Sequence, residues 1–115
     1  MENSVKISVL LEIYGKLLTK KQYKLLDDYY NLDLSLSEIA ENEHITRQAV
    51  RDNLKKGENK LFEYEEKLEI MKQTIEKKNT IENILSKITT INGNMSDKEI
   101  AKILEEVKQK LQILI

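Results

Sequence analysis

The chain has 115 residues, of which 40% are apolar and 34% charged, with a net charge of −1 and without proline, cysteine or tryptophan. The lack of cysteine excludes disulfides, thiolate zinc sites and cysteine nucleophiles, and one histidine leaves almost nothing for a histidine-based metal site or catalytic triad. Without proline and with only three glycines the chain lacks the turn residues of a sandwich or barrel, so we expect an all-α helical bundle that binds without catalysis, metal or cofactor.

Two helices are expected in the first 31 residues. Apolar residues recur at helical spacing from Ser4 to Leu18, which predicts the first of them. Thr19 and Gln22 then have the spacing of a capping box, in which the threonine hydroxyl accepts the amide proton of the glutamine. A second helix is therefore expected from about Lys20 to about Asn31.

A helix-turn-helix is predicted for about residues 35–60. A second capping box, Ser35 with Glu38, starts a short helix that should end near residue 42, and Thr46 is the expected N-cap of the next, cationic helix. The small Ala40 suits the point where the two helices cross, and Val50 and Leu54 would pack the second helix onto the first. His44 stands in the turn where the usual motif has a left-handed glycine.

The C-terminal part is also expected to be helical. Leu61, Leu68 and Ile75 are spaced by seven, and Tyr64 and Met71 follow the first two by three residues, which predicts about two heptads. The register then slips, so a bend is expected near residues 78–80. A turn at residues 92–94 and a third capping box at residues 96–99 introduce the last helix, which runs to about residue 114.

These elements predict one domain in two parts. Residues 1–60 would form the N-terminal helices with the helix-turn-helix, and residues 61–115 would serve packing and dimerisation. The apolar residues exceed what one small bundle can cover, which favours a homodimer. The alternative for the heptads is a packing face inside one protomer. The dimerisation candidates are Val5, Val9, Ile13, Leu68, Met71, Ile75, Ile81 and Leu85.

Charge points to the helix after the turn as the binding surface. Between His44 and Lys60 there are five basic and two acidic residues, a local balance of +3, while the rest of the chain has 14 basic and 18 acidic residues, a balance of −4. Because phosphate contacts dominate nucleic-acid affinity, this basic island favours DNA as the partner. The candidate DNA-binding residues are Thr46, Arg47, Gln48, Arg51, Asp52, Lys55 and Lys56.

Roles follow from position on the predicted helix. Arg47 or Arg51 would pair with guanine and Gln48 with adenine, while Lys55 and Lys56, a turn later, would meet phosphates. Asp52, in the same segment, could accept from a cytosine amine but would repel phosphate. It therefore also favours an alternative in which the helix serves a protein or RNA surface.

Two resemblances support this interpretation. The segment SLSEIAENEHITRQAVRDNLKKGENKL closely resembles the helix-turn-helix of sigma-factor region 4. The longer stretch from Val5 to Lys72, including DLSLSEIAE and KLFEYEEKL, is similar to the YlxM family of small bacterial helix-turn-helix proteins. That resemblance implies a DNA-binding regulatory protein linked to the signal recognition particle pathway, dimerised through helices outside the motif. The alternative is a protein or RNA adaptor that contacts signal recognition particle components or RNA polymerase.

The tyrosines allow two interpretations. Tyr23, Tyr29, Tyr30 and Tyr64 fall on or beside apolar stripes. Aromatic side chains can stack on RNA bases in single-strand binders, but at these positions core packing is favoured.

A cytoplasmic location without a membrane span is expected. No apolar run approaches the roughly 20 residues that a bilayer crossing needs. The first residues, MENSVKISVLLEIYGK, lack the basic n-region and small-residue cleavage site of a secretory signal.

Overall fold

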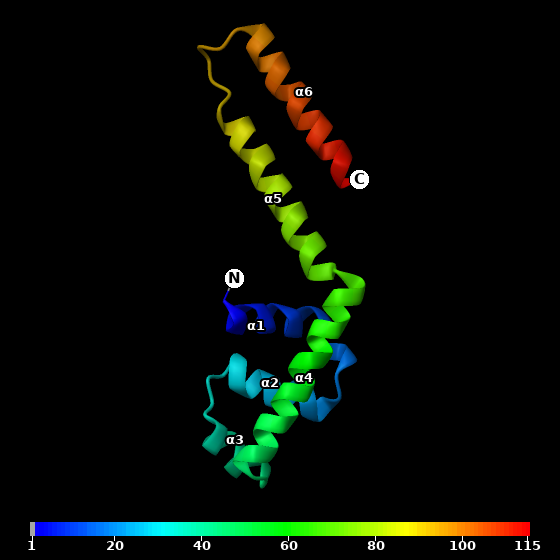
Figure 1. Ribbon diagram of the computed structural model, residues 1–115. Helices are drawn as coiled ribbons and strands as arrows, with labels where there is room; N and C mark the ends of the chain where they lie inside the picture. Colours follow the sequence, from blue (N-terminus) through cyan, green and yellow to red (C-terminus); the bar gives the residue numbers. More distant parts are fainter. Residues whose placement is uncertain (1) are drawn as a thin grey trace. The chain divides into compact units, whose positions relative to one another are not determined.

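The computed structural model describes residues 2–115, and this part of the chain is all-α, without strands (Figure 1). The predicted fold class is confirmed. None of the helices in residues 2–115 is both long and apolar enough to cross a membrane. The α-helices are α1 (Asn3–Tyr14), α2 (Lys20–Tyr30), α3 (Leu36–Glu43), α4 (Arg47–Leu68), α5 (Ile70–Thr89) and α6 (Asp97–Leu114), and a 3₁₀-helix, η1 (Gly15–Leu17), follows α1.

The chain divides into two compact units, one ending at Met71 and the other spanning Lys72–Ile115. In the first unit, α1, α2 and α3 pack against the long helix α4 (Figure 1). Each large apolar side chain that leaves water here contributes about 1.5 to 3 kcal/mol. The side chains that are no more than 2% exposed are Ile7, Leu10, Leu11, Tyr14, Leu25, Leu26, Ile39, Val50 and Leu61.

Gly57 allows α2 and α4 to approach closely. A Cβ atom at this position would stand only 2.8 Å from Cδ1 of Leu26, which is fully buried. Glycine costs roughly 1 kcal/mol relative to alanine inside a helix. Close packing against Leu26 gives a reason for its presence in the middle of α4.

The predicted helix starts are confirmed. The Ser35 hydroxyl accepts from the Glu38 amide at 3.1 Å, and the Glu38 carboxylate accepts from the Ser35 amide at 3.1 Å. Capping boxes of the same kind start α2 at Thr19 and α6 at Ser96. The Thr46 hydroxyl accepts from the Ala49 amide at 3.0 Å and starts α4. Each such cap contributes about 1 kcal/mol to helix stability.

The predicted bend near residues 78–80 is wrong, because α5 runs through this segment without interruption. The helix breaks instead at Glu69, which adopts a left-handed conformation with φ of 53°. The Ile70 amide donates to the Tyr14 hydroxyl at 3.1 Å, and the Met71 amide donates to the Glu65 carboxylate at 2.9 Å. These contacts satisfy amides that a helix start would otherwise leave without a partner. The predicted heptads are therefore divided between α4 and α5.

The tyrosines only partly follow the prediction of core packing. Tyr23 is 42% exposed, so its assignment to the core is wrong. Its ring lies close against η1 at Gly15. Tyr29, Tyr30 and Tyr64 are half-buried.

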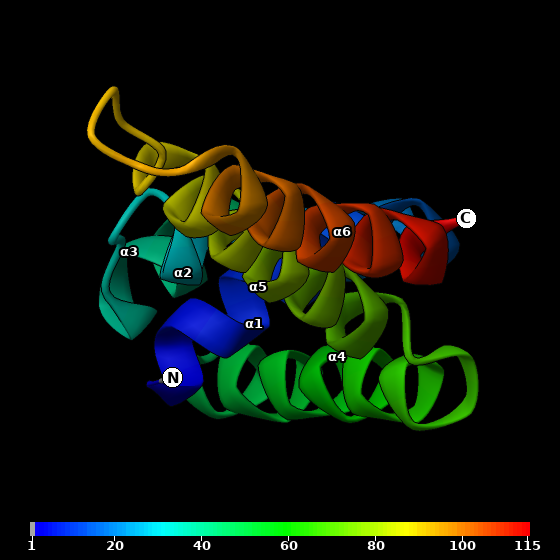
Figure 2. The same ribbon diagram turned by 90° about the horizontal axis from the view of Figure 1, so that it is seen from above.

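In the second unit, α5 and α6 run antiparallel, side by side (Figures 1 and 2). The two helices are joined by the predicted turn, in which the Asn94 amide donates to the Asn92 side-chain oxygen at 2.8 Å. Ile84 on α5 and Val107 on α6 are buried, at 5% and 7% exposure. Lys87 and Glu106 link the helices through an ion pair of 2.8 Å. The large apolar side chains of α5 and α6 that stay exposed within this unit are Ile81, Leu85, Ile88, Leu104, Leu111 and Ile113.

Candidate nucleic-acid interface

A three-residue turn joins α3 to α4, as predicted. His44 has φ of 56° and ψ of 41°, which confirms the left-handed conformation expected at this position. The Ile45 amide donates to the Ala40 carbonyl at 3.1 Å, and the His44 amide donates to the Glu41 carbonyl at 3.3 Å. These two bonds close the end of α3 in the manner of a Schellman motif. The chain then enters α4 directly through the Thr46 cap.

The turn places the first half of α4 firmly on α3. Ile39 and Val50 are fully buried, and Ala40 and Leu54 are 7% and 5% exposed. The predicted packing between the two helices is thus confirmed. A helix held along one side by apolar contacts presents its opposite side to water in a fixed orientation.

That opposite side carries the predicted binding residues. The structure brings them together as an exposed strip over the first three turns of α4: Thr46, Arg47, Gln48, Arg51, Asp52, Lys55 and Lys56. Within residues 2–115 none of the four basic side chains in this strip takes part in an ion pair. The strip therefore offers uncompensated positive charge to an anionic partner.

Asp52 is held by a neighbour on the same helix. The side-chain amide nitrogen of Gln48 donates to the Asp52 carboxylate at 3.0 Å. This bond orients the Gln48 amide, whose second proton and oxygen remain available. Elsewhere in residues 2–115 the acidic and histidine side chains form no cluster of three or more that could hold a metal ion.

A cleft of about 440 Å³ adjoins the strip, and sequence reasoning did not anticipate it. Its walls include Arg51 and Lys55 from α4 and Tyr29 and Tyr30 from α2. The Tyr30 hydroxyl donates to the Glu58 carboxylate, and burial followed by this hydrogen bond raises the pKa of Tyr30. Glu58 is thereby turned toward α2. No local pattern could have revealed this pair, because its members are 28 residues apart.

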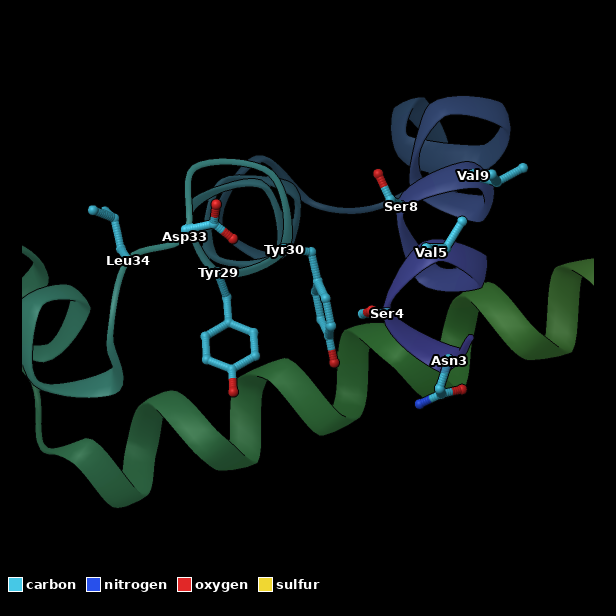
Figure 3. Close-up of a pocket in the computed structure, with 9 residues that line it drawn as sticks. All are labelled: Asn3, Ser4, Val5, Ser8, Val9, Tyr29, Tyr30, Asp33 and Leu34. Atoms are coloured by element: carbon cyan, nitrogen blue, oxygen red, sulfur yellow. The ribbon is translucent and has the colours of Figure 1, made fainter. Parts of the chain in front are cut away.

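The two tyrosines also form the boundary of a second hollow. Figure 3 shows Tyr29 and Tyr30 side by side, directed from the end of α2 toward α4. Their ring centroids are 5.0 Å apart in an edge-to-face arrangement. On the side of α1 they line a groove of about 720 Å³, together with Val5 and Ser8 (Figure 3). The pair thus separates this groove from the cleft beside Arg51.

The predicted dimerisation residues are distributed over both units. Val5 and Leu68 are each 48% exposed in the first unit, whereas Met71 is 9% exposed and belongs to its core. In the second unit Ile81 and Leu85 are 47% and 55% exposed. The half-buried members of the set are Val9, Ile13 and Ile75.

Comparison with known proteins gives a consistent match over nearly the whole chain. Residues 1–107 match the family UPF0122, described as "Putative helix-turn-helix protein, YlxM / p13 like". A UPF0122 protein of Clostridium kluyveri is 48% identical over 108 residues, which are 94% of each chain. A UPF0122 protein of Acetivibrio thermocellus is 40% identical over 115 residues, covering 100% of this chain and 98% of its own. A further one, from Fusobacterium nucleatum, is 36% identical over 107 residues, 93% of this chain and 97% of its own.

Proposed function

Since the chain belongs to the UPF0122 family of YlxM/p13-like helix-turn-helix proteins, we propose that it binds double-stranded DNA through the first turns of α4. The observation that carries the proposal is the two-sided character of α4. Val50 and Leu54 fix one side to α3, while Arg47 and Arg51 stand exposed on the other. In helix-turn-helix proteins the N-terminal residues of the second helix enter the major groove. The proposed role is regulatory binding in the cytoplasm, without catalysis.

Each exposed side chain has a chemical role in this proposal. Arg47 and Arg51 would donate in pairs to guanine O6 and N7, and Gln48 would read adenine, each good contact giving ~1–3 kcal/mol of discrimination. Lys55 and Lys56, about two turns from the start of α4, would contact phosphates and supply salt-dependent affinity.

We propose a homodimer in which the α5–α6 hairpin joins the protomers. The Lys87–Glu106 ion pair marks one edge of the hairpin. A helical repeat of 3.6 residues places the exposed Ile81, Leu85 and Leu104 on the opposite edge. Stacking this apolar edge on its counterpart would remove both from water, as in a four-helix bundle. A two-fold dimer would then present two α4 helices to a two-fold DNA site.

Asp52 supports a second candidate function. Its carboxylate stands within the basic strip and would repel a phosphate backbone, whereas donors on a protein surface or on exposed RNA bases could pair with it. In this alternative the same strip contacts signal recognition particle components or RNA polymerase. The rest of the chain, with 18 acidic and 14 basic residues, favours this alternative as well.

Retention on immobilised double-stranded DNA at low salt tests the first proposal. The double variant Arg47→Ala and Arg51→Ala should lose retention while circular dichroism shows unchanged helicity. Lys102→Ala with Lys108→Ala is a matched control, because it removes two exposed positive charges from α6. Equal loss in both variants, or unchanged retention in the first, would contradict DNA binding by α4.

A salt series separates DNA binding from binding to a protein surface. A protein that neutralises Z phosphates loses affinity with a slope of about −0.9Z in log K against log salt. Lys55→Ala with Lys56→Ala should therefore flatten the slope by about 2 if both lysines contact phosphates. An affinity that hardly responds to salt would favour the adaptor function in its protein-binding form instead.

A further inference from the structure

The corner between α1 and α2 has a cavity of its own, of about 470 Å³. Leu11, Leu18 and Tyr23 give it an apolar lining, and Lys16 and Lys20 stand at its border. A concave apolar pocket with a few charged side chains around it is the usual form of a site that accepts a protruding side chain.

Gly15 and Tyr23 create this pocket together. A Cβ atom on Gly15 would lie only 2.6 Å from the Tyr23 ring, so glycine is what allows the ring to close against η1. Tyr23 nevertheless stays 42% exposed, and Leu17 in the same turn is 55% exposed. Large apolar side chains gathered at one exposed corner are typical of contact surfaces.

The charges around the pocket have one predominant sign. Lys16 and Lys20 line the pocket, are exposed and take part in no ion pair within residues 2–115. Lys24, further along α2, is paired with Glu43, and Glu12 is the acidic residue in the lining. Residues 1–71 as a whole have 11 basic and 14 acidic residues, so this corner is a basic patch on an acidic unit. Charge complementarity therefore favours an acidic partner at this corner.

The corner is remote from the strip proposed to bind DNA. The Tyr64 hydroxyl donates to the Leu17 carbonyl at 3.3 Å, which places η1 beside the second half of α4. Tyr64 lies 13 residues beyond Arg51 in the sequence, or about 20 Å along the helix at 1.5 Å per residue. A partner at the corner would leave the first turns of α4 uncovered.

We propose that this corner docks an acidic peptide segment of another protein. A bulky apolar side chain of the segment enters the pocket over Leu18 and Tyr23, and carboxylates of the segment meet Lys16 and Lys20. The concave shape fits an anchored side chain better than a flat anionic membrane. The inference goes beyond DNA binding and does not depend on it, because it uses α1, η1 and α2 alone.

Fluorescence anisotropy with labelled helical peptides of about 15 residues tests the proposal on the full chain. The first peptide has glutamate on one face with leucine and phenylalanine on the other, the second replaces the apolar residues by alanine, and the third replaces glutamate by lysine. We expect the first peptide to bind at least about tenfold more tightly than either of the others, because both charge and anchor contribute.

Variants locate the binding site. Lys16→Glu with Lys20→Glu should weaken binding of the first peptide at least about tenfold, and Tyr23→Ala should also weaken it while circular dichroism stays unchanged. Lys55→Glu with Lys56→Glu is the matched control, with the same change of charge on α4, and should bind as the unmodified chain does. Amide chemical shifts should change mainly in residues 11–23.

Three results would overturn the proposal. The first is the absence of binding, and the second is binding that ignores the loss of the leucine and phenylalanine side chains, which would indicate unspecific charge attraction. The third is a set of shift changes centred on residues 47–56. Sedimentation of the chain with phosphatidylglycerol vesicles tests a membrane as the partner. If the chain sediments with the vesicles in a way that depends on Lys16 and Lys20, and no peptide binds, the corner would be assigned to a lipid surface.

Discussion

The Tyr14 hydroxyl donates a hydrogen bond of 2.7 Å to the Glu65 carboxylate, across 51 residues of sequence. The same hydroxyl accepts from the Ile70 amide at 3.1 Å, and the same carboxylate oxygen accepts from the Met71 amide at 2.9 Å. Two side chains thus satisfy the first amides of α5. The break between α4 and α5 is held by this arrangement rather than by a glycine or a proline.

Replacing Tyr14 by Phe should therefore destabilise the first unit. The change keeps the buried ring but removes one donor and one acceptor, which costs about 1 to 3 kcal/mol when buried groups are involved. Urea denaturation followed by circular dichroism measures the loss. Tyr64→Phe is the control, because its hydroxyl makes one exposed hydrogen bond of 3.3 Å. Equal losses in the two variants would contradict a special role for Tyr14.

His44 provides a test of backbone strain in the turn. Its φ of 56° is a conformation that glycine adopts without cost and that β-branched residues disfavour most. His44→Gly should raise the free energy of unfolding by about 0.5 to 1 kcal/mol, since relief of strain outweighs the extra freedom of the unfolded chain. His44→Val should lower it. Thermal denaturation of the two variants measures both changes in the free energy of unfolding. Changes of the same sign in the two variants would show that backbone strain at His44 is unimportant.

Stability should fall at alkaline pH. Burial, followed by the hydrogen bond to Glu58, raises the pKa of Tyr30, and burial also raises the pKa of Tyr14. In the unfolded chain a tyrosine releases its proton near pH 10, so above this pH the native state holds more protons than the unfolded state. The free energy of unfolding is then unaffected by these groups below about pH 10 and decreases above it.

The Tyr30→Phe variant checks this pH dependence. Denaturant midpoints measured between about pH 8 and pH 11 should decline less steeply in this variant than in the unmodified chain. Tyr23→Phe is the control, since it removes the hydroxyl of a tyrosine that is 42% exposed, and should leave the decline in place. An identical decline in all three proteins would rule out Tyr30 as a source.

The proposed dimer predicts a specific response to charge on the hairpin. Light scattering should give the unmodified chain twice the protomer mass of 13.5 kDa and the variant Ile81→Glu with Leu85→Glu the single mass. For the protomers to associate, the two carboxylates at the apolar edge would have to leave water, and this cost should prevent dimerisation. Asn79→Glu with Asn83→Glu adds the same charge on the opposite, exposed side of α5 and should remain dimeric. A single mass for the unmodified chain would exclude the dimer.

Most of the fold of the first unit could be predicted from local patterns. The starts of α2 and α3 follow from capping boxes, and the left-handed turn at His44 follows from its place in the motif. These signals are readable because a cap joins residues only three apart, and an apolar stripe repeats every three or four residues. The exposure of Arg47 and Arg51 follows from the same periodicity.

Other features depend on side chains that are distant in sequence. Periodicity predicted a bend near residues 78–80 from a slip in the apolar register, yet the chain breaks at Glu69, where Tyr14 and Glu65 supply partners for the amides of α5. Tyr23 follows the apolar stripe of α2 but remains 42% exposed, with its ring packed close against Gly15 of η1. Local spacing thus establishes which segments are helical and which of their sides is apolar. Where a helix stops without a glycine or a proline, and whether an apolar side is covered, depends on partners that folding brings from elsewhere in the chain.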